Sequence, residues 1–474
     1  MESAIVAGAG IAGLAAALEL ARAGVRVTVF EATDRPGGRA AQLVSPDGRF
    51  RFDMGPTILT MVDVLRRALG ADAFERLQLR RLEPGYRIVW PDGQTFDMHS
   101  DIALWLQEVS RYRSAGAASA LDYLAKMHGQ LNESRAKILE NPWTATGFSA
   151  LFSPGKLRPW VIGNLRNVAR RHFRDPRLVE AATFQTLYLG LSPHRAPAIY
   201  GLLMASEVVD GIWYAPGGTA TIVAALVAEC VRQGVRFQYN APVTCINVAE
   251  GRAHSVSVRD DVHQAEAVIV AADREPAARA LLGEKPPRRR LRYGHSAIVF
   301  YFGFDGPVDL PHHTVFLPND PWRAYAELER GRVSQEVLVY ACNPAVDDAT
   351  ATPGAVTALV PVPNRLALRD VDEAAIRDAV ITRLERHCGP LANRLVYQSV
   401  RGPKEFETQL GLAHGAAFGP DHRLNQMGPL RPSIAFRGAR NVAFAGSGTR
   451  PGSGVPMVLI SGRLAAEHVL AKAE

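Results

Sequence analysis

The chain has 474 residues, of which 47% are hydrophobic and 21% are charged. At roughly 150 residues per domain, this length predicts two or three folded units, each large enough to bury a core. The composition is that of a globular protein and excludes the disordered, collagen-like and disulfide-rich classes. The net charge of +7 is compatible with contact to anionic lipid or nucleic acid, but also with a basic surface that contacts only water.

The cysteine spacing and the first apolar run indicate the cellular compartment in which the protein is expected. Four cysteines are widely spaced and form no C-x-x-C pair: Cys230, Cys245, Cys342 and Cys388. This spacing argues against a zinc site, an iron–sulfur centre and a disulfide framework, and it fits a reducing compartment. The apolar run Ala4–Leu18 is too short to span a bilayer and lacks the basic start of a signal peptide. We therefore expect a cytoplasmic protein that can touch a membrane without crossing it.

The first forty residues predict a strand, a helix and a second strand in succession. Residues 4–7 are an apolar strand, residues 14–23 are a helix with one apolar face, and residues 25–30 alternate as a strand. A G-x-G-x-x-G sequence lies between the first strand and the helix, which is the context that this motif requires. The alternative is a glycine-rich turn that binds nothing.

Each residue of the motif has a physical role in binding a dinucleotide. Gly8 permits the tight turn, Gly10 lets the backbone approach a pyrophosphate, and Gly13 allows close packing of helix on strand. The helix N-terminus adds partial positive charge. Glu31 ends the second strand, where a carboxylate can accept hydrogen bonds from ribose hydroxyls. These features together predict a dinucleotide-binding site.

The segment that follows indicates which dinucleotide is bound. Arg35-Pro36-Gly37-Gly38-Arg39 directly after the second strand resembles the flavoprotein superfamily of amine oxidases, protoporphyrinogen oxidase and carotenoid desaturases. In that superfamily the glycines pass close to the cofactor, and the arginine helps to neutralise its phosphates. The resemblance implies FAD as the cofactor.

Later segments are expected to return the chain to this cofactor-binding unit. They are a helix over 220–233, strands over 235–239 and 265–271, and a strand over 441–445. A second glycine-rich turn at 446–454 then precedes a final helix, and its backbone N–H groups can face the flavin.

The predicted fold is a mixed α/β architecture with two interleaved domains. A Rossmann-like FAD-binding domain would comprise residues 1–94, 206–284 and 426–474. A substrate domain of mixed sheet and helix, facing the membrane, would comprise residues 95–205 and 285–425.

Further motifs resemble the bacterial and fungal phytoene desaturases, in family order from residue 5 to about 465. They are Phe52-Asp53-Met54-Gly55-Pro56-Thr57, Phe184-Gln185-Thr186-Leu187-Tyr188, Pro197-Ala198-Ile199-Tyr200, Gly211-Ile212-Trp213-Tyr214, Val360-Pro361-Val362-Pro363, Phe406, Gly415-Ala416-Ala417-Phe418-Gly419 and Gly446 to Pro456. The resemblance implies an FAD-dependent desaturase of a long isoprenoid hydrocarbon such as phytoene or dehydrosqualene. The sequence departs from the family pattern at Arg450, where the family often has His, and poorly matches it over 95–175.

The motifs and this resemblance together predict a set of residues that bind FAD. They are Gly8, Gly10, Gly13, Glu31, Arg39, Gly55, Pro56, Thr57, Val243, Asp273, Gly446, Gly448, Gly454, Val455 and Pro456.

The chemistry requires a hydride acceptor, because no carbonyl activates the C–H bonds of a hydrocarbon. The following proton loss needs only a carboxylate, a water or the reduced flavin. Glu405 and Arg450 are the predicted catalytic residues, and the alternative for both is a phosphate or ion-pair partner. No metal is expected at His312-His313, because neighbouring strand residues point to opposite faces.

A hydrocarbon substrate must come from a membrane, so a surface that contacts lipid is expected. Apolar side chains between Trp143 and Ile162 lie beside a basic stretch from Lys156 to Arg177, in which Asp175 is the one acid. The competing interpretation is a core helix with a solvated basic face. A second basic run, Lys285 to Arg292, is interpreted as a solvated loop, and no nucleic-acid-binding motif accompanies either run.

The sequence thus predicts a flavoprotein at the inner face of the cell membrane that desaturates a carotenoid precursor, with oxygen or a quinone as electron acceptor. Alternatives with the same cofactor are a hydroxycarotenoid desaturase, a carotenoid isomerase or oxidase, and an amine or porphyrinogen oxidase. A further alternative is an FAD-binding scaffold without catalytic activity.

Overall fold

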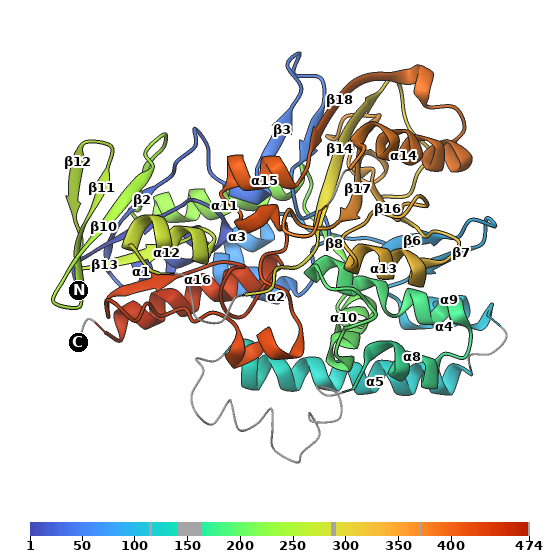
Figure 1. Cartoon of the computed structure of the whole chain (residues 1–474), viewed down its shortest axis with the longest axis horizontal. Coiled ribbons are helices and arrows are strands. Elements are labelled where there is room, and N and C mark those ends of the chain that lie inside the picture. Colours follow the sequence, from blue (N-terminus) through green and yellow to red (C-terminus); the bar gives the residue numbers. More distant parts are fainter. Residues whose placement is uncertain (113–115, 141–162, 286–290, 369–370, 473–474) are drawn as a thin grey trace.

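A computed structural model describes residues 1–112, 116–140, 163–285, 291–368 and 371–472. Two sheets dominate it, one towards each side of the view in Figure 1, with helices below and between them. The mixed α/β fold class that the sequence predicts is confirmed.

The first sheet is parallel and has five strands in the order β19-β13-β1-β2-β9. The strands are β1 (Ser3–Ala7), β2 (Arg26–Phe30), β9 (Arg236–Gln238), β13 (Ala267–Val270) and β19 (Val442–Phe444). The central strand β1 is apolar from Ala4 to Ala7 and its neighbour β13 is apolar throughout, because both faces of a parallel sheet are covered. Successive residues of β1 accordingly enter different cores: Val6 packs on the helical side, and Ile5 packs on the opposite side.

Four helices cover one face of this sheet, and a small sheet covers the other. The helices are α1 (Ile11–Arg22), α2 (Val62–Leu69), α11 (Thr219–Arg232) and α16 (Val455–Leu470). The opposite face packs against α12 (Arg274–Leu282) and the antiparallel strands β10 (Val243–Ala249), β11 (Arg252–Val258) and β12 (Asp261–Gln264). Helices α1 and α16 meet closely: a Cβ on Gly462 would lie 2.3 Å from the Ala12 carbonyl oxygen.

The second sheet has seven strands in the order β18-β14-β17-β16-β15-β6-β7, antiparallel except between β15 and β6. The strands are β6 (Tyr86–Val89), β7 (Thr95–Met98), β14 (Ser296–Phe304), β15 (His313–Phe316), β16 (Val339–Cys342), β17 (Ala355–Val362) and β18 (Leu395–Arg401). Apolar side chains of α14 (Glu373–Cys388) cover one face of this sheet.

A helical layer packs beside the second sheet. It consists of α4 (Ile102–Ser110), α5 (Ala117–Ser134), η2 (Arg135–Leu139), α8 (Leu165–His172), α9 (Pro176–Ala181), the 3-10 helices η3 (Phe184–Leu189) and η4 (Ala198–Gly201), α10 (Leu202–Val209) and α13 (Pro321–Glu329). Shorter elements connect the layers: β3 (Gln42–Val44), β4 (Arg51–Asp53), α3 (Ala71–Glu75), β5 (Arg80–Arg81), β8 (Trp213–Tyr214) and α15 (Pro403–Leu410). In the described ranges, every helix is too short or too polar to cross a bilayer.

The chain passes repeatedly between the two units. All five strands of the parallel sheet lie inside the predicted FAD-binding segments 1–94, 206–284 and 426–474. Strand β6 also lies inside the first of these segments, but it pairs with β15 and β7 of the seven-stranded sheet. The chain therefore passes from the first sheet to the second before β6, and not at residue 94.

Candidate active site: a dinucleotide cradle joined to an apolar chamber

One large cavity of about 1220 Å³ lies between the two sheets. Its lining combines the carboxyl ends of β1, β2 and β13 with strands of the seven-stranded sheet and with helices α5 and α10. In an open parallel sheet, ligands bind outside the carboxyl ends of the strands, so the position of the cavity is that of a ligand site.

At one end of the cavity, the first glycine-rich turn exposes backbone groups, and no side chains, to the cavity. Gly8 adopts φ +109°, which only glycine adopts readily, and Gly10 is the N-cap of α1 without a side-chain cap. A Cβ on Gly10 would meet no described atom within 4 Å, so this backbone faces open space in the cavity. A Cβ on Gly13 would lie 2.0 Å from the Gly8 carbonyl oxygen. This close approach of α1 to the turn after β1 therefore requires glycine at position 13.

Glu31 lies beside this turn and is nearly buried. Its Oε2 accepts a hydrogen bond from the Ala9 N–H at 2.7 Å, and its Oε1 accepts from the Thr33 N–H at 2.9 Å. These bonds hold the carboxylate at the cavity wall, as expected for a residue that accepts from ribose hydroxyls.

A second open helix end faces the same cavity. Helix α16 begins after Gly454, which has φ +107° and provides no side-chain cap. Val455 and Pro456 of its first turn line the cavity together with Gly446 and Gly448. The N–H groups and the partial positive charge of two helix ends thus converge on one space, an arrangement that suits a pyrophosphate and an anionic flavin ring.

Arg39 and Asp273 lie between these two turns. The Arg39 guanidinium donates to the Ala417 carbonyl oxygen at 2.8 Å and to Ser447 Oγ. Asp273 accepts from the Ala413 N–H at 2.9 Å through Oδ2, while its buried Oδ1 has no hydrogen-bond partner among the described residues. Burial lowers the pKa of Arg39 and raises that of Asp273, and the attraction between the two opposite charges partly offsets both shifts.

The loop Gly55-Pro56-Thr57 reaches across to the second sheet. A Cβ on Gly55 would lie 2.1 Å from the Arg39 carbonyl oxygen, and Thr57 Oγ1 lies 2.5 Å from the hydroxyl of Tyr340 on β16. Thr57 and Tyr340 both line the cavity, where the two sheets meet.

The structure brings nearly all predicted FAD-binding residues to this cavity. Its lining includes Gly8, Gly10, Glu31, Arg39, Gly55, Pro56, Thr57, Val243, Asp273, Gly446, Gly448, Gly454, Val455 and Pro456. Gly13 lies behind the wall and has the packing role that the motif assigns to it. The uncapped helix ends, the open space beside Gly10 and the unpaired Asp273 Oδ1 fit the requirements of FAD.

The two predicted catalytic side chains do not lie in the cavity wall. Arg450 donates to the carbonyl oxygens of Pro429 at 2.7 Å and Arg431 at 3.3 Å. Glu405 accepts from the Gly402 N–H at 2.9 Å and so caps α15. A role in the reaction for either residue stays a prediction, and the geometry favours a structural role.

The far side of the cavity is apolar. Helices α5, η3 and α10, the seven-stranded sheet and neighbouring segments contribute its walls. The apolar residues that line the cavity include Leu131, Leu139, Phe184, Leu187, Leu202, Leu203, Val299, Val315, Leu338, Leu359, Phe406 and Phe418. Such a chamber excludes water from a bound apolar chain.

A buried polar group in this apolar part was not predicted from the sequence. Glu207 on α10 lines the cavity, and its Oε2 accepts from the Tyr86 hydroxyl at 2.8 Å and from Gln185 Nε2 at 3.3 Å. The Tyr188 hydroxyl, also buried at the cavity, has no partner in the described structure. Burial raises the pKa of Glu207 to about 8, so the carboxyl is mostly protonated at neutral pH. The sequence feature that could have indicated this group is the single acidic residue in the mostly apolar sequence of α10.

The expectation for His312-His313 needs a correction. Strand β15 begins at His313, so the alternation of a strand does not extend to His312. The two rings lie 4.5 Å apart between centroids, and a nitrogen of each lies within 4.8 Å of the other and of Cys342 Sγ. The two side chains therefore converge, contrary to the reason given for excluding a metal.

Comparison with known proteins agrees with this geometry. The model of the family "Flavin containing amine oxidoreductase" matches residues 11–470. A zeta-carotene-forming phytoene desaturase of Myxococcus xanthus is 34% identical over 98% of this chain and 93% of its own. A phytoene dehydrogenase of Streptomyces griseus is 35% identical over 98% of this chain and 94% of its own.

Solved structures support the fold at low sequence identity. A putative protoporphyrinogen oxidase from Exiguobacterium has a TM-score of 0.61 at 15% identity, covering 99% of both chains. A triple mutant of putrescine oxidase has a TM-score of 0.65 at 18% identity, also covering 99% of both chains.

The predicted resemblance to phytoene desaturases is confirmed, and so is FAD as the cofactor. The protein is an FAD-dependent oxidoreductase, and its chain belongs to the flavin-containing amine oxidoreductase family.

Proposed function

We propose that this enzyme is a desaturase of a long isoprenoid polyene of the phytoene or dehydrosqualene type. The observation that carries the proposal is the continuity of one cavity from the uncapped ends of α1 and α16 to an apolar chamber. The curated relatives named as phytoene desaturases support the same substrate class.

The walls of the chamber position the substrate and keep water away from it. Bound FAD, held by the glycine turns, Glu31 and Arg39, supplies an acceptor for the hydride that leaves an allylic carbon. Leu131 on α5, Leu203 on α10 and Leu338 directly before β16 line the same space and can hold an extended chain between them.

Glu207 is placed to receive the proton that leaves the neighbouring carbon. After the hydride has left with both electrons of its bond, the adjacent C–H bond breaks and its electron pair forms the new double bond. The proton goes to Glu207 Oε1, because the hydrogen bonds from Tyr86 and Gln185 make Oε2 the less basic oxygen. Within the described lining, the other carboxylates, Glu31, Asp34 and Asp273, lie at the dinucleotide end.

The test is pigment analysis of bacterial cells that accumulate phytoene or dehydrosqualene, with and without this chain. New polyenes with red-shifted absorption are expected, and their maxima count the double bonds added. Cells that make the Gly10→Val variant are the control, because that variant cannot hold the cofactor. Colourless cells containing soluble, flavin-loaded protein would refute the proposed substrates and direct the search to oxygenated carotenoids.

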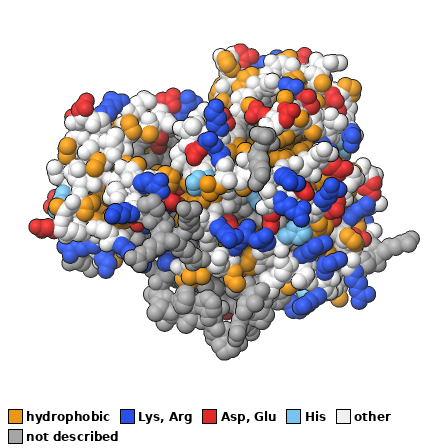
Figure 2. Space-filling view, in the orientation of Figure 1, with side chains coloured by type: hydrophobic (Ala, Val, Ile, Leu, Met, Phe, Trp, Pro, Cys, Tyr) orange, Lys and Arg blue, Asp and Glu red, His pale blue; other side chains and the backbone are white. Residues whose placement is uncertain are grey.

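The electron acceptor and the location of the enzyme extend this proposal. Oxygen or a quinone reoxidises the flavin, and an anaerobic assay with added quinone distinguishes the two. The enzyme binds the inner face of the cell membrane, because its hydrocarbon substrate dissolves there. The exposed arginines Arg170, Arg171 and Arg174 support this location, and Figure 2 shows Lys and Arg side chains gathered around α8 and α13. The predicted apolar part of this surface, residues 143–162, lies outside the described residues.

Binding to vesicles tests the membrane surface. Each basic group near an anionic surface contributes about 1 kcal/mol, so changing these three arginines to Glu should weaken binding to anionic liposomes at least about tenfold. The control changes Arg236, Arg259 and Arg437, which are exposed at the parallel sheet and its cover. Equal sedimentation of both triple variants with liposomes would refute this surface.

A further inference from the structure

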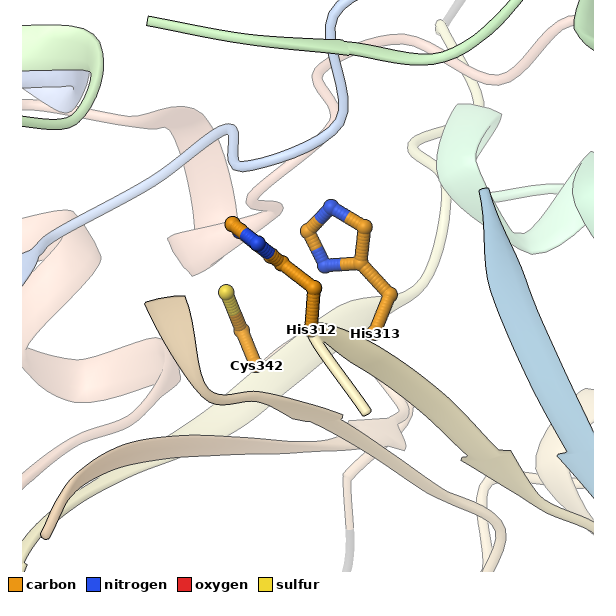
Figure 3. A group of neighbouring side chains, drawn as sticks. All are labelled: His312, His313 and Cys342. Carbon is orange, nitrogen blue, oxygen red and sulfur yellow. The ribbon is translucent and has the colours of Figure 1, made fainter. Parts of the chain in front are cut away.

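Three buried side chains with metal-binding atoms lie together behind the cavity wall. His312, His313 and Cys342 each offer a ligand atom, and these atoms lie within 4.8 Å of one another. Figure 3 shows the two imidazoles leaving neighbouring positions of the chain and the thiol leaving β16 beside them. His313 and Cys342 pair directly across the antiparallel ladder of β15 and β16, so their side chains share one face.

The hydrogen bonds of the two imidazoles leave one nitrogen of each available. His312 Nδ1 lies 2.8 Å from Asp347 Oδ2, and His313 Nδ1 lies 2.8 Å from the Tyr340 hydroxyl. The Nε2 atoms of both histidines are buried and have no partner among the described atoms. Histidines that bind metals typically use their second nitrogen in this way, with a carboxylate or another oxygen fixing the ring.

An unpaired nitrogen on each buried imidazole is costly in a protein interior unless a partner is present. His312 is 3% exposed and His313 is 0% exposed, so bulk water does not serve as that partner. The local charge favours a cation: Asp347 contacts His312, and the Asp53 carboxylate interacts electrostatically with His312 and Cys342.

We propose that His312, His313 and Cys342 bind a zinc ion as three protein ligands, which leaves the fourth tetrahedral position to a water. Two imidazole nitrogens and a thiolate are ligands that Zn²⁺ prefers, with Zn–N of about 2.0–2.1 Å and Zn–S of about 2.3 Å. In tetrahedral geometry these bonds place the ligand atoms about 3.3–3.6 Å apart, so side-chain movements of about 1 Å close the site. The thiol loses its proton on binding, and Asp53 and Asp347 offset the remaining positive charge.

The site would stiffen the wall at which the two sheets meet. The Tyr340 hydroxyl that contacts His313 also contacts Thr57 Oγ1, and both Tyr340 and Thr57 line the cavity. The inference does not depend on the identity of the substrate.

The test begins with metal analysis of the flavin-loaded protein, purified from zinc-supplied cells with any histidine tag removed. We expect one equivalent of zinc, and after its removal a single equivalent of Co²⁺ should give the intense near-ultraviolet band of a thiolate–cobalt bond. In the Cys342→Ala variant, zinc content should fall at least tenfold and the cobalt band should vanish.

A matched control is Cys245→Ala, since Cys245 is an exposed cysteine away from the cluster. It should keep both the zinc and the cobalt band. Absence of the metal and the band in the unmodified protein would refute the site, as would zinc that survives Cys342→Ala. If Cys342→Ala does not fold, His312→Gln takes its place, and the cobalt spectrum of the unmodified protein still decides.

Discussion

The two ends of the cavity are constructed from different parts of the polypeptide. At the dinucleotide end, backbone groups of the turns around Gly10 and Gly454 form the wall. At the apolar end, side chains from separate segments of the chain form the wall, such as Leu131, Leu203 and Leu338. A backbone turn with these conformations accepts few residue types, so it is visible in the sequence as a motif. An apolar wall accepts many different apolar residues and leaves no such motif. The substrate end can therefore change while the cofactor end stays the same.

The largest expected effect comes from the packing glycine behind the dinucleotide end. Gly13→Ala places a Cβ 2.0 Å from the Gly8 carbonyl oxygen, where only backbone could move to relieve it. We expect the free energy of unfolding to fall by about 3 kcal/mol or more. Denaturant unfolding measures this loss. The control is Gly129→Ala in α5, where a Cβ meets nothing within 4 Å of the described structure. Equal stability of both variants would contradict the packing argument.

Gly10→Val should separate cofactor binding from folding. Gly10 has φ −70° and ψ 169°, which valine adopts, and its side chain would extend into the cavity. The variant should fold but lose its flavin absorbance at least about tenfold, because the pyrophosphate needs this space.

Gly116→Val is the matched control for that change. Gly116, at the start of α5, is also an N-cap in extended conformation, and a Cβ there would meet no described atom within 4 Å. It should retain its flavin fully. Loss of flavin in both variants, or in neither, would show that Gly10 does not lie beside the pyrophosphate.

The apolar end is tested at Glu207. The Glu207→Gln change keeps an oxygen that accepts from Tyr86 but removes the proton-accepting carboxylate. A positioned base contributes about 100-fold, so kcat should fall by that order with little change in KM. In the unmodified enzyme kcat should rise with pH up to about 8, where the carboxyl becomes ionised.

The Glu180→Gln variant is the control for the effect of changing a buried carboxyl group that lies outside the cavity. Glu180 accepts from Trp90 Nε1 at 2.8 Å, and burial raises its pKa, but it lies outside the cavity lining. Its kcat should change less than about twofold. A similar fall of kcat in both variants would mean that Glu207 only supports the structure.

Stability should also depend on pH through Glu207. Its pKa is raised from 4.5 to about 8 in the folded protein, so between these values the folded state holds a proton that the unfolded chain has released. The free energy of unfolding of the unmodified protein should therefore fall, relative to Glu207→Gln, as pH rises from about 5 to 8. A constant difference between the two proteins would contradict burial of this carboxyl.

The smallest effect on turnover is expected at Arg450. Its guanidinium donates to two backbone carbonyl oxygens, so Arg450→Ala should cost about 1–2 kcal/mol of stability. The rate of flavin reduction by substrate should change less than about twofold. A large fall in that rate, with flavin binding intact, would restore Arg450 as a catalytic residue.

The same difference between the two ends explains what the sequence could predict. The strand, glycine turn and helix of residues 3–22 follow local rules, and so do the final strand and helix around 442–470. Glu207 and Tyr86 meet only through the tertiary fold, and an acid in an apolar helix has no local signature of its partners. The cluster of His312 and His313 was missed because the start of β15 could not be located to within one residue. Likewise, β6 has no local feature that assigns it to the second sheet and not the first.

The central strand of the parallel sheet comes from residues 3–7, and the outer strand β19 comes from residues 442–444. Helix α16 then packs against α1 near the N-terminus of the chain, and Figure 1 shows both chain ends on the same side. During synthesis, the ribosome has therefore released the first glycine turn long before the second one exists. The FAD site is complete only after the second glycine turn and helix α16 have been translated. Until then the apolar residues of the chamber are not fully enclosed, and exposed apolar surface of this kind favours aggregation.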